Sequence, residues 1–255
     1  VATITVTPTF TNNGVTCSGS TKTFTITVNP TGQVVQPSDI TKCNGQVASA
    51  TFASNNSGGT NSYAWTNSNI AIGLGASGTG NISFTTTNSG TQAIAGTITV
   101  TPTFTFNGVG CQGTAKSFVV TVNPTPVVTF DIANQTICSG GTSTIVNLST
   151  VTSGATISWT CTQPAGITGV TTSGTTTIPA QTLSNSTTAP ITVNYVAHAT
   201  TTGNASCPGL DYTYSIVVNP VAQVNQPSNQ TVCNNANTTA VNFASTNTGG
   251  TVTYA

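Results

Sequence analysis

The sequence is nearly without charge. Among 255 residues it has three lysines, three aspartates and one histidine, and it has no arginine, glutamate or methionine. About a quarter of a soluble domain is usually charged, against 2% here. Lys22, Lys42 and Lys116 lie far apart, so we expect neither the cation cluster that nucleic-acid binding requires nor attraction to an anionic membrane surface. No apolar run approaches the roughly 18 residues of a membrane span, so we also expect no membrane insertion.

The few ionisable side chains leave little acid–base or metal chemistry. Asp39, Asp131 and Asp211 are scattered along the chain, whereas calcium sites and carboxylate dyads need carboxylates close together. His198 with Asp211 and a serine could nominally form a hydrolase triad. However, the alternating run at 191–197 predicts a strand that His198 ends, and no Gly-x-Ser-x-Gly nucleophile elbow is present. We therefore expect no enzyme, no metal site and no cofactor.

The residues that are abundant favour strands and turns. Threonine is the most frequent residue, followed by asparagine, serine, glycine and valine, and 36% of the chain is hydrophobic. Apolar and polar residues alternate with a period of two, which is the pattern of half-buried strands. The sequence therefore predicts an all-β fold with buried cores.

An internal repeat organises the chain. A strand-like segment ends in Val-Asn-Pro at residues 28–30, 122–124 and 218–220, so the period is 124 − 30 = 94 and then 220 − 124 = 96 residues. One cysteine precedes each of these prolines by 13 residues, and a second cysteine follows each proline at a similar interval. A period of about 95 residues matches one immunoglobulin-like β-sandwich and exceeds the repeat length of solenoids.

Cutting the chain at the prolines gives four segments. Residues 1–30 are predicted to be the F and G strands that end one repeat, 31–124 and 125–220 to be complete repeats, and 221–255 to begin a further repeat. Almost no linker separates them, and proline fixes φ and extends the residue before it. We therefore expect tandem sandwiches stacked end to end. Because the first residue already lies inside an alternating segment, we expect the chain to be an internal piece of a longer protein.

Within the repeat at 31–124 the alternation predicts six strands. They are expected at 33–41, 48–53, 62–67, 81–87, 96–106 and 115–122. Trp65 and Trp159 lie 159 − 65 = 94 residues apart at the same point of the third strand, where immunoglobulin-like sandwiches bury a tryptophan. Both are expected in the core. Pro102 and its counterpart Pro8 fall inside a predicted strand, so we expect a bulge or a sheet edge there.

Seven cysteines in so polar a chain indicate an oxidising compartment, and their wide spacing favours disulfides over zinc ligation. The two cysteines of one repeat fall in turns at opposite ends of a sandwich, too far apart for a bridge. Stacking of repeats instead predicts a bond between Cys43 and Cys207. The partners of the following would then lie outside this sequence: Cys17, Cys111, Cys138 and Cys233.

The alternative pairing joins Cys43 to Cys111 and Cys138 to Cys207. Cys161 has no counterpart in the other repeats and lies two residues after Trp159, on the same strand face. We expect it to be a buried free thiol.

The assembled pattern resembles the PKD-like and Ig-like repeats of giant secreted surface proteins of Bacteroidota, of the SprB gliding-adhesin type. The resemblance covers the whole chain. It is carried by the segments Gln135–Gly140, Tyr63–Asn67, Ile72–Gly78, Gly110–Cys111 and Thr121–Pro124. It implies type IX secretion, display at the cell surface and a role in adhesion or gliding.

Two functions are expected from this reading. The first is a structural shaft of an extracellular adhesin or surface filament, whose partners are the neighbouring repeats of the same chain and other filament subunits. The second is an Ig-like module that binds surface glycans or another surface ligand, because the regions 65–95 and 159–190 differ in their residues between the two complete repeats. Both place the protein outside the cell.

Overall fold

The computed structural model describes residues 1–203 and 205–255. The fold is all-β, as the alternation predicted, and its one helical turn in the described residues is a short 3-10 segment at Ile70–Ile72. The chain divides into two compact units. The first comprises residues 1–87 and 95–121, and the second comprises residues 88–94 and 122–255.

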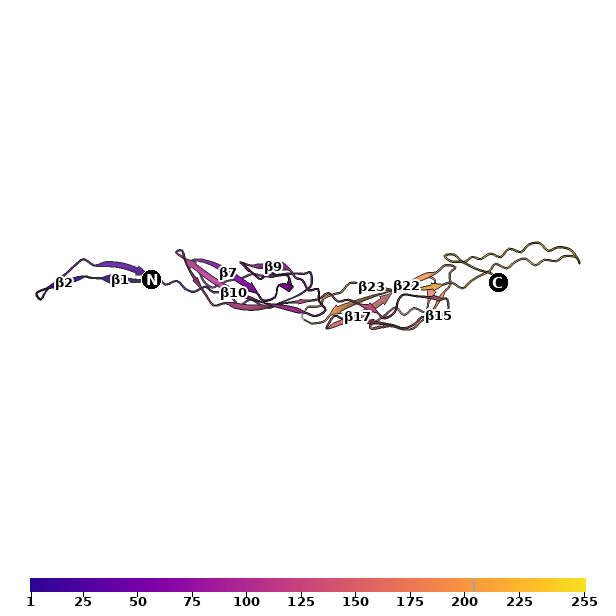
Figure 1. Cartoon of the computed structure of the whole chain (residues 1–255), viewed down its shortest axis with the longest axis horizontal. Coiled ribbons are helices and arrows are strands. Elements are labelled where there is room, and N and C mark those ends of the chain that lie inside the picture. Colours follow the sequence, from indigo (N-terminus) through magenta and orange to yellow (C-terminus); the bar gives the residue numbers. More distant parts are fainter. Residues whose placement is uncertain (204) are drawn as a thin grey trace. The chain divides into compact units, whose positions relative to one another are not determined.

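In the first unit, residues 31–87 and 95–121 form a two-layered sandwich (Figure 1). One layer has the order β5-β12-β10-β7-β8, with β11 paired to β10, and the other is the pair β6-β9. The strands are β5 (Ile40–Cys43), β6 (Val47–Ala50), β7 (Thr60–Asn67), β8 (Ser77–Thr79), β9 (Ile82–Thr85), β10 (Ile94–Phe106), β11 (Val109–Gln112) and β12 (Lys116–Asn123).

The core of this sandwich follows the period-two pattern of its long strands. Alternate residues of β10 are buried, among them Ile98, Val100 and Phe104, and the intervening threonines point away from the core. Phe118 and Val120 of β12 lie on the same inward face. The threonine-rich strands therefore bury one apolar face and leave a hydroxyl-bearing face in water.

The second unit contains the other complete sandwich (Figure 1). Its largest sheet has the order β14-β23-β22-β17-β19, and two three-stranded sheets, β13-β16-β20 and β15-β21-β18, accompany it. The strands are β13 (Thr129–Phe130), β14 (Gln135–Cys138), β15 (Gly141–Thr142), β16 (Val146–Ser149), β17 (Ala155–Cys161), β18 (Ile167–Thr168), β19 (Ser173–Gly174), β20 (Thr177–Ile178), β21 (Thr182–Asn185), β22 (Ile191–Thr201) and β23 (Tyr212–Asn219).

One hydrophobic core unites these three sheets. Trp159 of β17 packs edge to face on Tyr195 of β22, with ring centroids 5.6 Å apart, and both side chains are buried with Val193, Ile216 and others. The second strand of this sandwich, β14, runs parallel to the last, β23, while the other pairs of the main sheet are antiparallel. An early strand and the last strand of the sandwich thus lie side by side.

The structure corrects two sequence expectations. The predicted strand at 33–41 is a strand only from Ile40 onward. Pro37 has no N–H to donate, and side chains replace the ladder before that point: Gln36 Nε2 donates to the Ser117 carbonyl, and the Val119 N–H donates to Asp39 Oδ1.

Pro102 lies in the central strand β10, not at a sheet edge, and its register with β7 is unbroken on both sides. Its missing N–H coincides with the place where β10 changes partner from β11 to β12. There the Pro102 carbonyl accepts from the Gly113 N–H. The interruption is therefore in the partner strand, and the expected bulge or edge was wrong.

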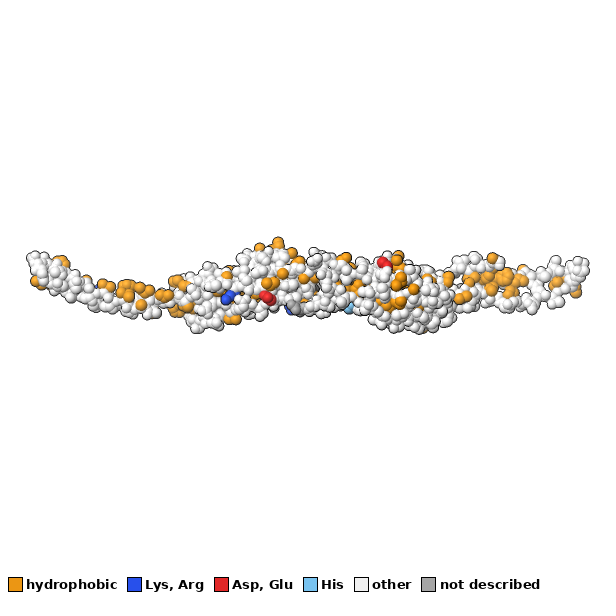
Figure 2. Space-filling view, turned by 90° about the horizontal axis from the view of Figure 1, so that it is seen from below, with side chains coloured by type: hydrophobic (Ala, Val, Ile, Leu, Met, Phe, Trp, Pro, Cys, Tyr) orange, Lys and Arg blue, Asp and Glu red, His pale blue; other side chains and the backbone are white. Residues whose placement is uncertain are grey.

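The two terminal segments, residues 1–30 and 221–255, leave most of their side chains exposed. Residues 1–30 form two antiparallel pairs, β1 (Ala2–Val6) with β4 (Lys22–Ile26) and β2 (Thr9–Asn12) with β3 (Val15–Ser18), all exposed. Residues 221–255 contain no strand. Apolar side chains gather on the surface of both segments in Figure 2.

Candidate functional site

The residues at the repeat boundaries make a recurring set of contacts. In the first two Val-Asn-Pro segments the asparagine, here called the linker asparagine, donates from its side chain to the loop that follows the longest strand of the next repeat, β10 or β22. Asn29 Nδ2 lies 3.0 Å from the Phe106 carbonyl oxygen and 3.4 Å from that of Val109. Asn123 Nδ2 lies 3.1 Å from the Ala205 carbonyl oxygen. One side of the boundary is therefore held by an amide side chain.

A second recurring element is a loop that we call the acceptor loop, residues 88–92 in one repeat and 185–189 in the next. In each loop a buried asparagine holds the backbone from within. Asn88 Nδ2 donates to the carbonyls of Gln92 and Val122. Asn185 Nδ2 donates to the carbonyls of Ala189 and Val218, and its Oδ1 accepts from the N–H and the hydroxyl of Thr187.

Each acceptor loop offers one carbonyl to the chain that follows. The Thr91 carbonyl accepts from the Ser153 N–H at 2.9 Å, and the Thr188 carbonyl accepts from the Thr248 N–H at the same distance. The donors are equivalent residues, 248 − 153 = 95 positions apart, each followed by a glycine with positive φ. The same bond recurs in the next repeat. Its acceptor is a main-chain carbonyl of the acceptor loop, and its donor is a main-chain N–H of the equivalent turn in the chain that follows.

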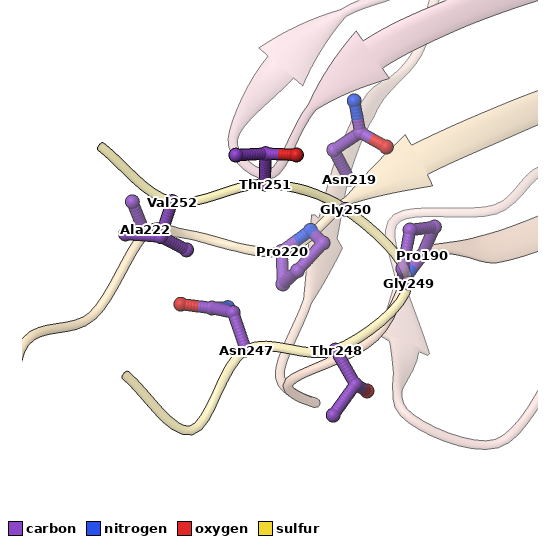
Figure 3. A pocket seen from close by; sticks show the side chains of 10 residues that line it. All are labelled: Pro190, Asn219, Pro220, Ala222, Asn247, Thr248, Gly249, Gly250, Thr251 and Val252. Carbon is purple, nitrogen blue, oxygen red and sulfur yellow. The ribbon is translucent and has the colours of Figure 1, made fainter. Parts of the chain in front are cut away.

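Figure 3 shows the boundary after the second sandwich at close range. Pro190, Pro220 and Gly249 help to line an open cavity of about 340 Å³. Asn247 Nδ2 also donates to the carbonyls of Thr188 and Val221. A Cβ on Gly249 would lie 3.0 Å from Pro190 Cδ, so these two segments of the chain approach closely here.

The linker asparagines and the acceptor loops thus lie near the points where one repeat follows another along the sequence. Each such hydrogen bond contributes on the order of 1 kcal/mol net. None of the contacts uses a charged group, so salt screens them little. The contacts are made by main-chain groups and by amide side chains.

The cysteines fall into two states. Cys43 and Cys207 are disulfide-bonded and buried. Free thiols are carried by Cys17, Cys111, Cys138, Cys161 and Cys233. Cys111 and Cys138, which the alternative pairing would oxidise, are thus free. Cys161 is buried among the core residues, and burial raises its pKa above the usual value, which keeps the thiol protonated and unreactive.

Both tryptophans are buried at equivalent points of β7 and β17. Each indole lies directly over a glycine, Gly78 under Trp65 and Gly174 under Trp159. Trp159 Nε1 donates to the Thr177 carbonyl at 2.9 Å, whereas Trp65 Nε1 has no hydrogen-bond partner. Only glycine leaves room for the ring at these two places.

The structure brings His198 and Asp211 together, but at the surface. His198 Nδ1 lies 3.5 Å from Asp211 Oδ1, and the two side chains are 41% and 70% exposed. His198 Nε2 contacts the Thr200 hydroxyl at 3.1 Å. Ser158, the cross-strand neighbour of His198, lines the same shallow hollow. Catalytic dyads work in sites that exclude water, and this pair is open to solvent.

Three further groups have shifted pKa values, each with a local cause. Hydrogen bonds from the side chain and backbone of Asn147 lower the pKa of Asp131. Burial raises the pKa of Tyr195 to about 12, with the hydrogen bond from Gln181 acting in the opposite direction. Burial also raises the pKa of Tyr214. The shifts leave each of these groups with its usual charge at neutral pH.

Within the described residues, no helix is long and apolar enough to cross a bilayer. The same residues contain no cluster of three or more histidine, cysteine, aspartate or glutamate side chains that could hold a metal ion.

Comparison with sequence families gives one match, which lies in the second sandwich. Residues 135–222 match the sequence model of the PKD-like domain, and the match covers less than half of the chain. No curated protein sequence matches the chain.

Among solved structures, the chain is similar to hemolin, an insect immune protein, at 15% identity over 85% of this chain and 56% of hemolin, with a TM-score of 0.35. It is also similar to extracellular domains 3–5 of Drosophila OTK, at 13% identity over 81% of this chain and 67% of that one, with a TM-score of 0.36. Three titin immunoglobulin domains match at 9% identity over 75% of this chain and 67% of theirs, with a TM-score of 0.35. The β-sandwich that the period of the repeat indicated is seen in the sheets of the second unit described above.

The acceptor-loop asparagines were missed by the sequence reasoning. Their signal was available: Asn88 and Asn185 lie 185 − 88 = 97 residues apart, each between the last polar positions of one predicted strand and the start of the next. The chain is so rich in asparagine that this spacing does not stand out from those of its other asparagines.

Proposed function

We propose that these repeats form a structural shaft of an extracellular adhesin or surface filament that supports cell-surface adhesion or gliding. The observation that carries the proposal is the recurrence of one backbone hydrogen bond, Ser153 to Thr91 and Thr248 to Thr188, at successive boundaries. A module that only binds a ligand needs no repeated boundary. A shaft needs every boundary to resist bending.

The linker asparagines support the same proposal. Asn29 and Asn123 each donate to the loop that follows the longest strand of the next repeat, β10 or β22. The boundary therefore has a contact on each side of the linker, and the proline that follows each asparagine restricts the linker itself. Secretion by a type IX system and a gliding role rest on the resemblance to Bacteroidota surface proteins and belong to this proposal.

Within this proposal, Cys43 pairs with Cys207. Support comes from their oxidised state and from the free thiols at the other cysteines of the described residues. A bond between repeats adds a covalent restraint that side-chain contacts cannot supply, and it fits an oxidising compartment outside the cell. Mass spectrometry of peptides from the non-reduced protein should find Cys43 linked to Cys207. A peptide joining Cys43 to Cys111 would overturn the pairing.

Small-angle X-ray scattering of the whole chain tests the shaft. We expect an extended particle whose maximum dimension is the same at low and high salt. Asn123→Ala removes the contact with the Ala205 carbonyl and should increase bending, seen as a broader distance distribution at unchanged secondary structure. Asn194→Ala is the matched control, because Asn194 is exposed and bonds only the Ser215 hydroxyl. A compact particle for the unaltered chain would refute the shaft.

A glycan-binding module is the second candidate, favoured by one surface feature. Tyr63 lies half-buried in an open hollow of about 370 Å³ with Asn61, Ser62 and Thr79 around it. An aromatic ring edged by amides and hydroxyls is a usual platform for a sugar. Saturable binding on a glycan array that Tyr63→Ala abolishes would promote this function over the shaft.

A further inference from the structure

Three asparagines of the chain are followed directly by glycine: Asn13, Asn44 and Asn107. An asparagine loses its carboxamide most readily in this sequence, because glycine has no Cβ to hinder attack of its own nitrogen on the neighbouring side chain. The structure places the Asn-Gly pairs of the first sandwich, at Asn44 and Asn107, in different surroundings. Those surroundings decide which of the two can react.

The pair Asn107-Gly108 forms the tip of the hairpin between β10 and β11. Its φ angles are 48° and 76°, the two positive values that a type I′ turn requires. Asn107 is exposed and lines an open hollow of about 330 Å³ together with Asn29. In the described part of the chain, neither the Asn107 carboxamide nor the Gly108 N–H has a hydrogen-bond partner. Both reacting groups are therefore unbonded and open to water.

The turn that contains Asn44 is held from inside the sandwich. The Gly45 N–H donates to the Thr86 carbonyl at 2.8 Å. The Thr86 hydroxyl donates in turn to the carbonyls of Cys43 and Gln46, at 2.7 and 2.9 Å, and Thr86 is completely buried. The nitrogen that would attack Asn44 is thus already bonded. Asn44 is the matched reference for Asn107 within the same chain.

The contact with Asn29 controls the hairpin tip. Asn29 Nδ2 lies 3.0 Å from the Phe106 carbonyl oxygen and 3.4 Å from that of Val109, so one amide group bridges the two ends of the turn. Loss of a carboxamide passes through a five-membered imide, which fixes the asparagine main chain in a conformation that a type I′ turn does not have. The turn must open before the ring can close. The Asn29 contact therefore opposes the reaction, and its opening permits it.

We propose that Asn107 is a self-modification site, at which Gly108 attacks the Asn107 side chain when the Asn29 contact opens. The Gly108 nitrogen forms a bond to Cγ of Asn107, and the carboxamide nitrogen leaves as ammonia with the Gly108 proton. Water then opens the imide. Attack at the side-chain carbon gives aspartate, and attack at the main-chain carbon gives isoaspartate. Either product adds one negative charge to a chain whose net charge is zero.

The isoaspartate product changes the turn itself. Its main chain runs through Cβ and Cγ and is one carbon longer between the Phe106 and Val109 carbonyls, so the two acceptors lose the separation that Asn29 Nδ2 bridges. A contact that has opened then cannot re-form as it was, and the modification records the opening permanently. Its effect on bending rests on the proposed shaft, whereas the reaction itself does not.

Peptide mapping of the whole chain, kept folded at mildly alkaline pH, tests the site. We expect Asn107 to lose its carboxamide at least about fivefold faster than Asn44, the factor by which one hydrogen bond shifts an opening equilibrium. In urea the two rates should be similar. Equal rates in the folded chain would overturn the site, and a difference that persisted in urea would assign it to the flanking sequence and overturn the structural argument.

The dependence on Asn29 has its own variant. Asn29→Ala should raise the rate at Asn107 about fivefold and leave the rate at Asn44 unchanged. Asn123→Ala is the matched control, because it removes the equivalent linker asparagine, which donates to the Ala205 carbonyl and not to this hairpin. It should change neither rate. An unchanged rate at Asn107 in Asn29→Ala would overturn the coupling to the Asn29 contact.

Small-angle X-ray scattering before and after the same incubation tests the consequence. The distance distribution of the unaltered chain should broaden, and that of Asn107→Gly should not, because a Gly-Gly pair keeps the type I′ turn and has no carboxamide to lose. Asn13 is present in both chains and cancels from the comparison. Equal broadening in both would overturn the effect of Asn107 on bending. A compact particle for the fresh chain would refute the shaft and leave the rates at Asn107 and Asn44 as measured, so the two failures are distinguishable.

Discussion

Replacing Asn185 should unfold the second sandwich at a much lower temperature. This side chain is 5% exposed and makes four hydrogen bonds. Nδ2 donates to the carbonyls of Ala189 and Val218 at 2.8 Å each, and Oδ1 accepts from the Thr187 N–H at 2.9 Å and from its hydroxyl at 2.8 Å. It joins the acceptor loop to the end of β23.

The magnitude follows from what Asn185→Ala leaves behind. The Val218 carbonyl is inside the sandwich and loses the Asn185 donor, and the bonds at the loop end can be partly replaced by water. With about 1 kcal/mol for each replaceable bond and up to 3 kcal/mol for a buried group left without a partner, we expect a loss of about 3–4 kcal/mol. For a domain of this size that lowers the melting temperature by roughly 12–30 °C.

Asn185→Asp sharpens the test. The carboxylate keeps the acceptor for Thr187 but loses both N–H donors and places an oxygen against two carbonyl oxygens. It should therefore be at least as unstable as the alanine variant at neutral pH. Calorimetry and urea unfolding measure both. Asn194→Ala is the exposed control and should change stability by less than about 0.5 kcal/mol. If the aspartate variant were as stable as the unaltered chain, the two donated bonds would not matter and the reasoning would fail.

Three further outcomes are expected. Gly78→Ala places a Cβ 2.3 Å from the Trp65 ring and should cost about 1–3 kcal/mol in urea unfolding, while Gly75→Ala, with nothing closer than 4.0 Å, should be neutral. Because burial raises the pKa of Tyr195 from 10.0 to about 12 in the folded chain, stability should hold up to about pH 10 and fall toward pH 12, and a flat alkaline profile would contradict this. Between pH 5 and 8 the melting temperature should stay constant in low and moderate salt, because His198 is the only histidine and ion pairs are few.

The period of the sequence predicted the architecture because a repeat must bury the same face each time. Alternation in 96–106 placed Val100 and Phe104 in the core, and the spacing of Trp65 and Trp159 placed both on equivalent strands. The alternation pattern gave a wrong strand boundary at 33–41, where side-chain hydrogen bonds take the place of main-chain ladder bonds. Asp39 accepts the Val119 N–H in place of a ladder bond, and alternation cannot distinguish such a segment from a strand.

The boundary contacts were only half predictable. The linker prolines marked the boundaries, but the bonds that hold them join Thr91 to Ser153 and Thr188 to Thr248 through main-chain atoms. Main-chain donors and acceptors leave no trace in residue identity, so no composition or motif could reveal them. The buried asparagines that shape the acceptor loops do leave a trace, though one that becomes visible only when the repeats are superposed.

That same main-chain bond has a consequence for how such a chain can change over generations. Since the carbonyl of an acceptor loop and the N–H of the next turn are present whatever side chains surround them, one repeat can follow any other of its kind. Duplication or loss of a whole repeat would recreate a compatible boundary at once, with no compensating substitutions. Length can then vary between descendants while the way in which neighbours join is inherited unchanged.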